Sequence, residues 1–103
     1  MDTRQAEKEI IEVLKTIYDP EIPVNIYDLG LIYEVKVKED GSGWIEMTLT
    51  SPNCPVAESL PVEVEQKTQT VEGVNTVKVD IVFEPPWDKD MMSEEAKYEL
   101  GML

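Results

Sequence analysis

The sequence predicts an α/β two-layer (α+β) domain with the element order α-β-β-α-β-α, in which helices cover one face of a three-stranded sheet. Three observations lead to this fold class. The chain has 103 residues, which suits a single domain over residues 1–103. Apolar side chains alternate along three short segments, as they do in half-buried strands. In other segments of the chain, apolar side chains recur at the three- and four-residue spacing of a helix.

The first predicted helix covers residues 3–17. Its apolar side chains recur at intervals of three and four residues, at Ala6, Ile10, Val13, Leu14 and Ile17. Asp2 is placed to cap the helix start. The Asp19-Pro20 step ends the helix, because a residue before proline is pushed out of the helical region.

An acidic loop follows, with the sequence DPEIPVNIYDLG over residues 19–30. Its apolar residues, interspersed with two prolines, indicate an ordered loop that packs on the core. The loop carries three carboxylates, on Asp19, Glu21 and Asp28. Such side chains are usually turn-formers or solvated charges, but they could serve as oxygen ligands if the loop folds beside Cys54.

Residues 31–38 and 44–50 form a predicted antiparallel hairpin. Alternation in the first strand directs one set of side chains to the core: Leu31, Tyr33, Val35 and Val37. The second strand alternates in the same way, and the glycines of the intervening EDGSG segment suit a short turn. The two strands are therefore expected to be neighbours.

A second helical pattern follows Cys54, with apolar side chains on one side at Val56, Leu60, Val64 and Val71. Pro61 conflicts with it, because an interior proline costs about 3 kcal/mol. Either the first turn is irregular, or the regular helix begins near Pro61. Gly73 is predicted to end this helix.

The third strand is predicted over residues 75–84, with the inward side chains Val77, Val79, Ile81 and Phe83. The preceding helix makes the connection between the second and third strands a crossover. A proline-rich loop then leads to Ser93, which is expected to cap a short terminal helix that ends at Gly101.

The charge balance of the chain restricts the classes of partner that it can bind. Twenty-two acidic residues against nine basic ones give a net charge of -13, which disfavours nucleic acid and anionic membranes as ligands. No stretch reaches the ~20 apolar residues of a membrane span. The chain opens on a charged helical segment rather than an export signal. Together with the single cysteine, these features predict a cytoplasmic protein.

Cys54, the only cysteine, lies in the stretch TSPNCPVAESL over residues 50–60. Proline is favoured at the first position of a helix, so Pro55 would make Cys54 the N-cap. There the positive end of the helix favours the thiolate. The alternative is a small buried hydrophobe, because free cysteine is among the most buried residue types.

If the thiol reacts, its chemistry is restricted. The chain has no histidine to act as a base and no second cysteine for dithiol cycling, which leaves metal binding or a transient adduct. A four-iron cluster needs four ligands, and one chain supplies one thiolate. We therefore expect no stable cofactor. Any iron-sulfur cluster would be transient and shared between the chains of a homodimer or with a partner.

Three segments, DPEIPVNIYDLGLIYEV, MTLTSPNCPVAESL and VEGVNTVKVDIVFEPPWDKDMMSEEAKYELG, resemble the SufT-like metal-sulfur cluster assembly factor family, which also includes the PaaD proteins. The resemblance covers about residues 6–101. It implies an iron-sulfur cluster assembly domain-like fold and an accessory role in iron-sulfur protein maturation. Its implied partners are the assembly machinery and client apoproteins.

The resemblance also implies site residues, in three motifs. Its T-x-P-x-C-P motif corresponds to Thr50, Pro52, Cys54 and Pro55. Its D-P-E and D-L-G motifs correspond to Asp19, Glu21 and Asp28, and its P-P-W segment includes Pro86 and Trp87. PaaD proteins typically carry a further cysteine-bearing tail, so an end at Leu103 favours the SufT-like branch.

Several functions remain open at this stage. The first is a non-enzymatic cluster-assembly factor that acts through Cys54. Alternatives are a PaaD-like subunit of an aromatic-degradation (phenylacetate) complex, a cysteine-nucleophile enzyme assisted by Asp28 or Asp19, and an adaptor in which the thiol is inert. The apolar side chains Trp87, Met91 and Met92 either pack down over the end of the sheet, the favoured interpretation, or contact a partner.

Overall fold

A computed structural model describes residues 2–19, 23–49 and 59–101 of the chain. Across these residues the chain forms a sheet of three strands, β1 (Ile32–Val37), β2 (Ser42–Met47) and β3 (Thr76–Ile81), in the order β1-β2-β3. β1 and β2 are antiparallel, whereas β2 and β3 are parallel. The predicted hairpin and crossover are both confirmed.

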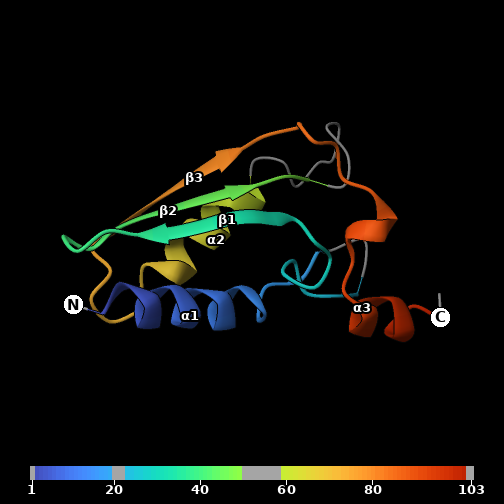
Figure 1. The fold of residues 1–103 in the computed structure, drawn as a ribbon, viewed down its shortest axis with the longest axis horizontal. Helices are drawn as coiled ribbons and strands as arrows, with labels where there is room; N and C mark the ends of the chain where they lie inside the picture. The colour runs from blue at the N-terminus through green and yellow to red at the C-terminus, as the bar shows by residue number, and fades with distance from the viewer. Residues whose placement is uncertain (1, 20–22, 50–58, 102–103) are drawn as a thin grey trace.

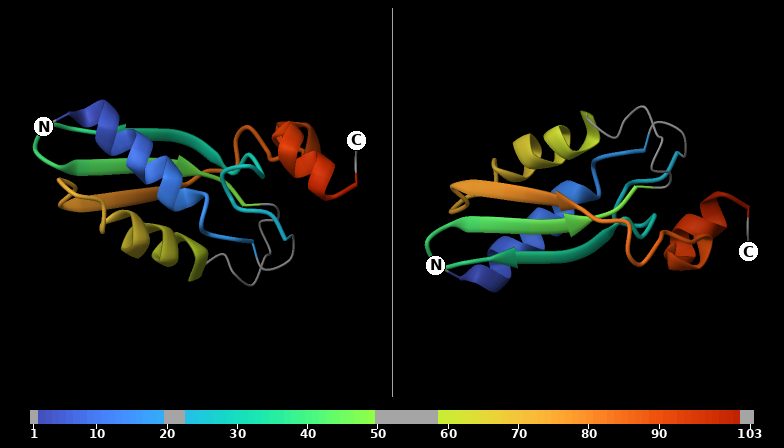
Figure 2. Two further views of the ribbon diagram at one scale, coloured as in Figure 1. Left: turned by 90° about the horizontal axis from the view of Figure 1, so that it is seen from below. Right: turned by 90° about the horizontal axis from the view of Figure 1, so that it is seen from above.

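Two helices, α1 (Thr3–Leu14) and α2 (Ser59–Thr68), lie side by side against one face of the sheet (Figures 1 and 2). The C-terminal elements, a 3-10 turn η1 (Lys89–Met91) and the helix α3 (Glu94–Glu99), lie beyond the end of the sheet (Figure 1). The predicted fold class and element order are confirmed. The helices α1 and α2 provide the second layer, and α3 does not.

The helix α1 begins as predicted and ends earlier. The Asp2 carboxylate accepts hydrogen bonds from the backbone N–H groups of Arg4 and Gln5, at 3.1 and 3.2 Å. The helix ends at Leu14 rather than at residue 17, because Thr16 donates both its N–H and its hydroxyl to the Val13 carbonyl and so tightens the last turn.

A β-bulge changes the predicted alternation of β1. Ile32 pairs with Met47 and Glu34 pairs with Glu46, so the register shifts at Tyr33. Ile32 therefore packs against the core and Tyr33 does not continue the inward row, which corrects the expectation for Tyr33. A bulge inserts one residue without changing the apolar composition, so alternation alone does not reveal it.

In α2, Pro61 is the third residue and lies in the first turn, where a backbone N–H has no partner within the helix. The helix ends at Thr68, and the predicted end at Gly73 is wrong. Gly73 instead adopts a positive φ of 87° in the turn before β3. β3 ends at Ile81, so Phe83 does not face the core and is 45% exposed.

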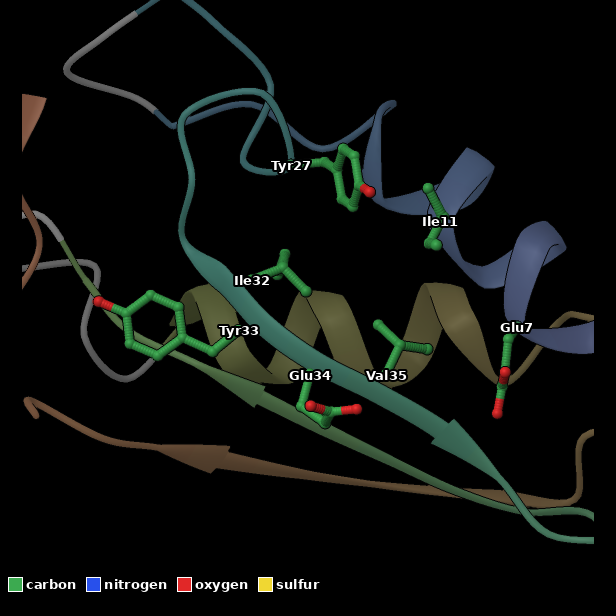
Figure 3. A pocket seen from close by; sticks show the side chains of 7 residues that line it. All are labelled: Glu7, Ile11, Tyr27, Ile32, Tyr33, Glu34 and Val35. Carbon is green, nitrogen blue, oxygen red and sulfur yellow. The ribbon is translucent and has the colours of Figure 1, made fainter. Parts of the chain in front are cut away.

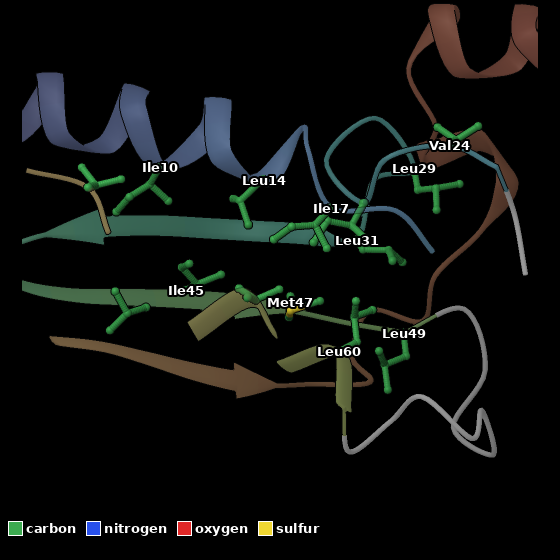
Figure 4. Close-up of a cluster of buried hydrophobic side chains, with 14 of the residues drawn as sticks. Ile10, Leu14, Ile17, Val24, Leu29, Leu31, Ile45, Met47, Leu49 and Leu60 are labelled. Atoms are coloured by element: carbon green, nitrogen blue, oxygen red, sulfur yellow. The ribbon is translucent and has the colours of Figure 1, made fainter. Parts of the chain in front are cut away.

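The core lies between the sheet and the helices (Figure 4). Ile10 and Leu14 of α1 are fully buried against Ile45 and Met47 of β2. The loop before β1 also contributes buried side chains to this core: Ile17, Val24, Ile26, Leu29 and Leu31. The prediction of an ordered, core-packed loop is therefore confirmed for its described part. Within the described residues, no helix is long and apolar enough to span a bilayer.

Candidate functional site

The predicted site residues that the structure describes gather in the loop between α1 and β1 and in the C-terminal segment that packs on it. Cys54, Thr50, Pro52, Pro55 and Glu21 lie outside the described residues. The described chain stops at Leu49 before the cysteine stretch and resumes at Ser59 after it. Leu49 and Leu60 are both buried and belong to one hydrophobic cluster (Figure 4).

The loop is held in shape by its own backbone. Tyr18 and Asn25 form an antiparallel bridge, and the Ile26 N–H donates to the Ile17 carbonyl at 2.8 Å. Because both sides of the loop also bury aliphatic side chains, its position relative to the end of the sheet is fixed. The carboxylates at its base are therefore carried on an ordered frame.

Asp28 forms a turn through two reciprocal bonds with Asn25. The Asn25 Nδ2 donates to Asp28 Oδ2 at 2.8 Å, and the Asp28 N–H donates to Asn25 Oδ1 at 2.9 Å. This is the turn-forming role that aspartate commonly has. The side chain is half-buried, so one carboxylate oxygen is used within the loop while the residue stays at its surface.

Asp19 is different, because it is only 4% exposed and interacts within the fold. Its N–H donates to the Val24 carbonyl at 3.4 Å. The interpretation of this residue as a solvated charge is therefore wrong. Of the loop carboxylates that the structure describes, one is buried and one forms a turn.

The described residues do not assemble a metal site by themselves. Among them, no group of three or more histidine, cysteine, aspartate or glutamate side chains is placed to hold a metal ion. Neither Cys54 nor Glu21 belongs to this set. Asp19 and Asp28 could thus contribute to a ligand set only together with donors from elsewhere.

The C-terminal segment packs onto the loop. The Trp87 indole N–H donates to the Leu29 carbonyl at 2.7 Å, and the Ser93 N–H donates to the Asp28 carbonyl at 2.8 Å. Met92 is buried in the core, and Trp87 is half-buried against it. The packed-down interpretation is confirmed for both, and a partner contact by Met92 is wrong because its side chain is inaccessible.

Tyr33 and Gly30 complete the junction between the acidic loop and the C-terminal segment, and neither was predicted from the sequence as part of it. The Tyr33 hydroxyl donates to the Pro85 carbonyl at 2.7 Å and lies 3.7 Å from the Met91 Sδ. Burial raises the pKa of Tyr33. Gly30 has a φ of +84°, and a Cβ there would collide with the Met91 carbonyl. The glycine of the DLG motif was the only sequence feature that indicated a close approach between the loop and Met91.

A shallow pocket runs along the free edge of β1, between that strand and α1 (Figure 3). Ile11 and Tyr27 line it from the helix and the loop, while Ile32 and Val35 line it from the strand. The Glu7 carboxylate accepts a hydrogen bond from the Val37 N–H at 3.0 Å. Glu7 thus satisfies an edge N–H that another chain could otherwise pair with, so its role here is structural.

The fold and this junction define a class of small α+β domains in which a core-packed acidic loop and a C-terminal segment close one end of a two-layer core. The model of the iron-sulfur cluster assembly protein family matches residues 7–81, and the chain belongs to this family. The SufT-like resemblance is thereby confirmed. The C-terminal segment that packs on the loop lies outside the matched range.

Curated relatives agree with this membership. The chain is 58% identical over 99 residues to an Fe-S protein maturation auxiliary factor of Porphyromonas gingivalis, which covers 96% of this chain and 94% of that protein. It is 40% identical over 86 residues to the auxiliary factor SufT of Staphylococcus aureus, with coverages of 84% and 98%. A putative 1,2-phenylacetyl-CoA epoxidase subunit of Escherichia coli is 37% identical over 94 residues, with coverages of 89% and 55%.

A solved structure has the same fold. The crystal structure of a domain of unknown function from Bacillus anthracis superposes with a TM-score of 0.90 at 37% identity, and the match covers 100% of this chain and 98% of that one. The likeness extends over the whole chain, and so includes the C-terminal segment that the family model leaves out.

Proposed function

We propose that this chain is a non-enzymatic accessory factor that helps to assemble iron-sulfur clusters or to transfer them to client proteins. The observation that carries the proposal is the 58% identity to a maturation auxiliary factor over 96% of the chain. The epoxidase protein ranks second, because this chain covers only 55% of it but 94% of the auxiliary factor. The partners would be the assembly machinery and client apoproteins, in the cytoplasm.

Cys54 is the proposed transfer thiol. Thiolates are the preferred ligands of iron-sulfur clusters, and this is the only cysteine in the chain. The cluster would be cargo rather than a resident cofactor, because one thiolate leaves most coordination positions to a second chain or a partner. Thr50, Pro52 and Pro55 would shape the thiol's own segment, and Asp19, Glu21 and Asp28 its surroundings.

A cysteine-nucleophile enzyme is less well supported. The chain has no histidine, so a carboxylate would have to act as the base. The Asp28 Oδ2 already accepts a hydrogen bond from Asn25 at 2.8 Å, so this oxygen is engaged within the loop. Asp19 is buried and interacts within the fold. Both features favour a thiol that acts as a ligand.

The test is complementation in cells that depend on this chain, under iron limitation. Cys54→Ser should reduce the activity of iron-sulfur enzymes such as aconitase to the level of cells lacking the chain, while the variant stays folded by circular dichroism. Thr70→Ser, a comparable change at an exposed residue, should behave as the wild type. Normal aconitase activity with Cys54→Ser would refute the role of the thiol.

A further inference from the structure

Of the helices and strands that the structure describes, none covers the face of the sheet opposite α1 and α2 (Figure 2, right). The strand register arranges its side chains in rows that cross all three strands. Glu34 pairs with Glu46, which pairs with Asp80, and these form an acidic row. Two residues away on each strand, and on the same face, Lys36 pairs with Trp44, which pairs with Lys78. A basic row with an indole at its centre therefore lies directly beside an acidic row.

This face differs from the rest of the molecule in charge. Lys38 extends the basic side and lines the same groove as Lys36, Lys78 and Trp44. The face thus carries three lysines and three carboxylates and is neutral. The whole chain has only nine basic residues and a net charge of -13, so the remaining surface carries all of the excess charge. Two copies of a chain with this net charge repel each other on average, so a neutral face with both signs of charge is the more favourable surface for contact.

We propose that the open sheet face binds a second copy of this chain, through a two-fold axis that lies in the interface and runs across the strands between the two rows. Such an axis places the acidic row of each copy on the basic row of the other. Glu34 then faces the Lys36 position, Asp80 faces the Lys78 position, and Glu46 faces the Trp44 position. A two-fold axis along the strands would instead place like charges together.

Existing contacts within one copy support this exchange. The Lys36 Nζ lies 3.3 Å from Glu34 Oε1, and the Lys78 Nζ lies 3.8 Å from Asp80 Oδ1. These pairs are solvent-exposed and contribute little on their own. Across a closed face, each lysine would have a carboxylate on either side and less water around it. Trp44, whose indole N–H donates to Asp80 at 2.6 Å, is held at the centre in one orientation.

The size of the face sets the strength of the association. Three strands of six residues give a face of about 20 by 15 Å, from ordinary strand rise and spacing. An interface of that size falls below the roughly 1,000 Å² that a stable specific complex buries and belongs with weak, transient contacts. The dimer is therefore weak and reversible. It does not depend on the proposed function, because aconitase activity and oligomeric state are separate measurements.

The test is a charge reversal with rescue, measured by sedimentation equilibrium of the full chain. The wild type should associate reversibly at concentrations up to about 1 mM, the range expected of small interfaces. Lys36→Glu places like charges opposite each other twice per dimer, so it should weaken association about ten-fold or more. Adding Glu34→Lys restores opposite charges across the axis, and should return association to near the wild-type level.

Lys8→Glu is the matched control, since it makes the same change in net charge on an exposed position of α1 away from the face. It should leave association within about two-fold of the wild type, as is usual for a distant independent site. A wild type that stays monomeric, a Lys36→Glu variant no weaker than Lys8→Glu, or a double variant that fails to recover would each overturn the proposal.

Discussion

Gly30 is the residue at which the loop and the C-terminal segment come closest. Its positive φ and the adjacent Met91 carbonyl each exclude a larger residue, for two separate reasons. The first is backbone strain and the second is a steric collision with backbone that is already held in the η1 turn. The junction beside the acidic loop therefore depends on the absence of a side chain at one position.

Replacing Gly30 with alanine should lower the free energy of unfolding by at least about 2 kcal/mol, because the new Cβ adds a backbone collision to the strain of a positive φ. Urea unfolding measures the change. Gly101 offers a matched control, since it has a φ of +73° and a Cβ added there would meet nothing within 4 Å. Gly101→Ala should cost only about 1 kcal/mol, the strain alone. Equal effects at both sites would contradict the close approach.

At the scale of single residues, helix caps can be predicted from the sequence, whereas contacts over long sequence separation cannot. Asp2 and Ser93 were predictable as helix caps because their partners lie within three residues. The bond from Trp87 to Leu29 joins residues 58 positions apart, and no local pattern contains it. For the same reason, the burial of Asp19 could not be predicted from its place in a polar, proline-rich segment.

At the scale of elements, α2 resolves the difficulty that Pro61 raised. A proline in the first turn removes an N–H that has no helical acceptor, so the usual cost of an interior proline does not arise. The sequence allowed two solutions. It could not choose between them because the start of a helix depends on packing and capping as well as on composition.

Pro61→Ala should therefore change the free energy of unfolding by less than about 1 kcal/mol, since the proline mainly restricts the unfolded chain. Moving the proline into the helix gives the contrast. Glu65→Pro, at an exposed position in the middle of α2, should cost about 3 kcal/mol. Thermal unfolding followed by circular dichroism measures both. A large loss with Pro61→Ala would mean that the proline has a specific structural contact.

Strand boundaries show the same limit of local reasoning. Alternation located β1, β2 and β3, but the bulge at Tyr33 and the end of β3 before Phe83 depend on pairing with a neighbouring strand. The bulge has a consequence for the junction, because the Tyr33 hydroxyl reaches the Pro85 carbonyl. Composition indicated how many strands there are, and pairing determined where they bend and stop.

For the whole molecule, the predicted layers are confirmed because periodicity reports directly which side of each element is apolar. The distribution of charge was not predictable in that way. A net charge of -13 describes the chain as a whole, while the strand register, together with the adjoining Lys38, brings three of its nine basic residues to one neutral face. Only the fold relates these distant positions to each other.

The proposed function rests on a Cys54 thiol that a partner can reach. As the only cysteine, it can be alkylated with iodoacetamide and followed by mass spectrometry without interference. In native buffer we expect a rate within about ten-fold of that in denaturing urea, as for an accessible thiol. A thiol protected by about a thousand-fold or more, and released only by global unfolding, would be a buried core residue and would contradict the proposed transfer role.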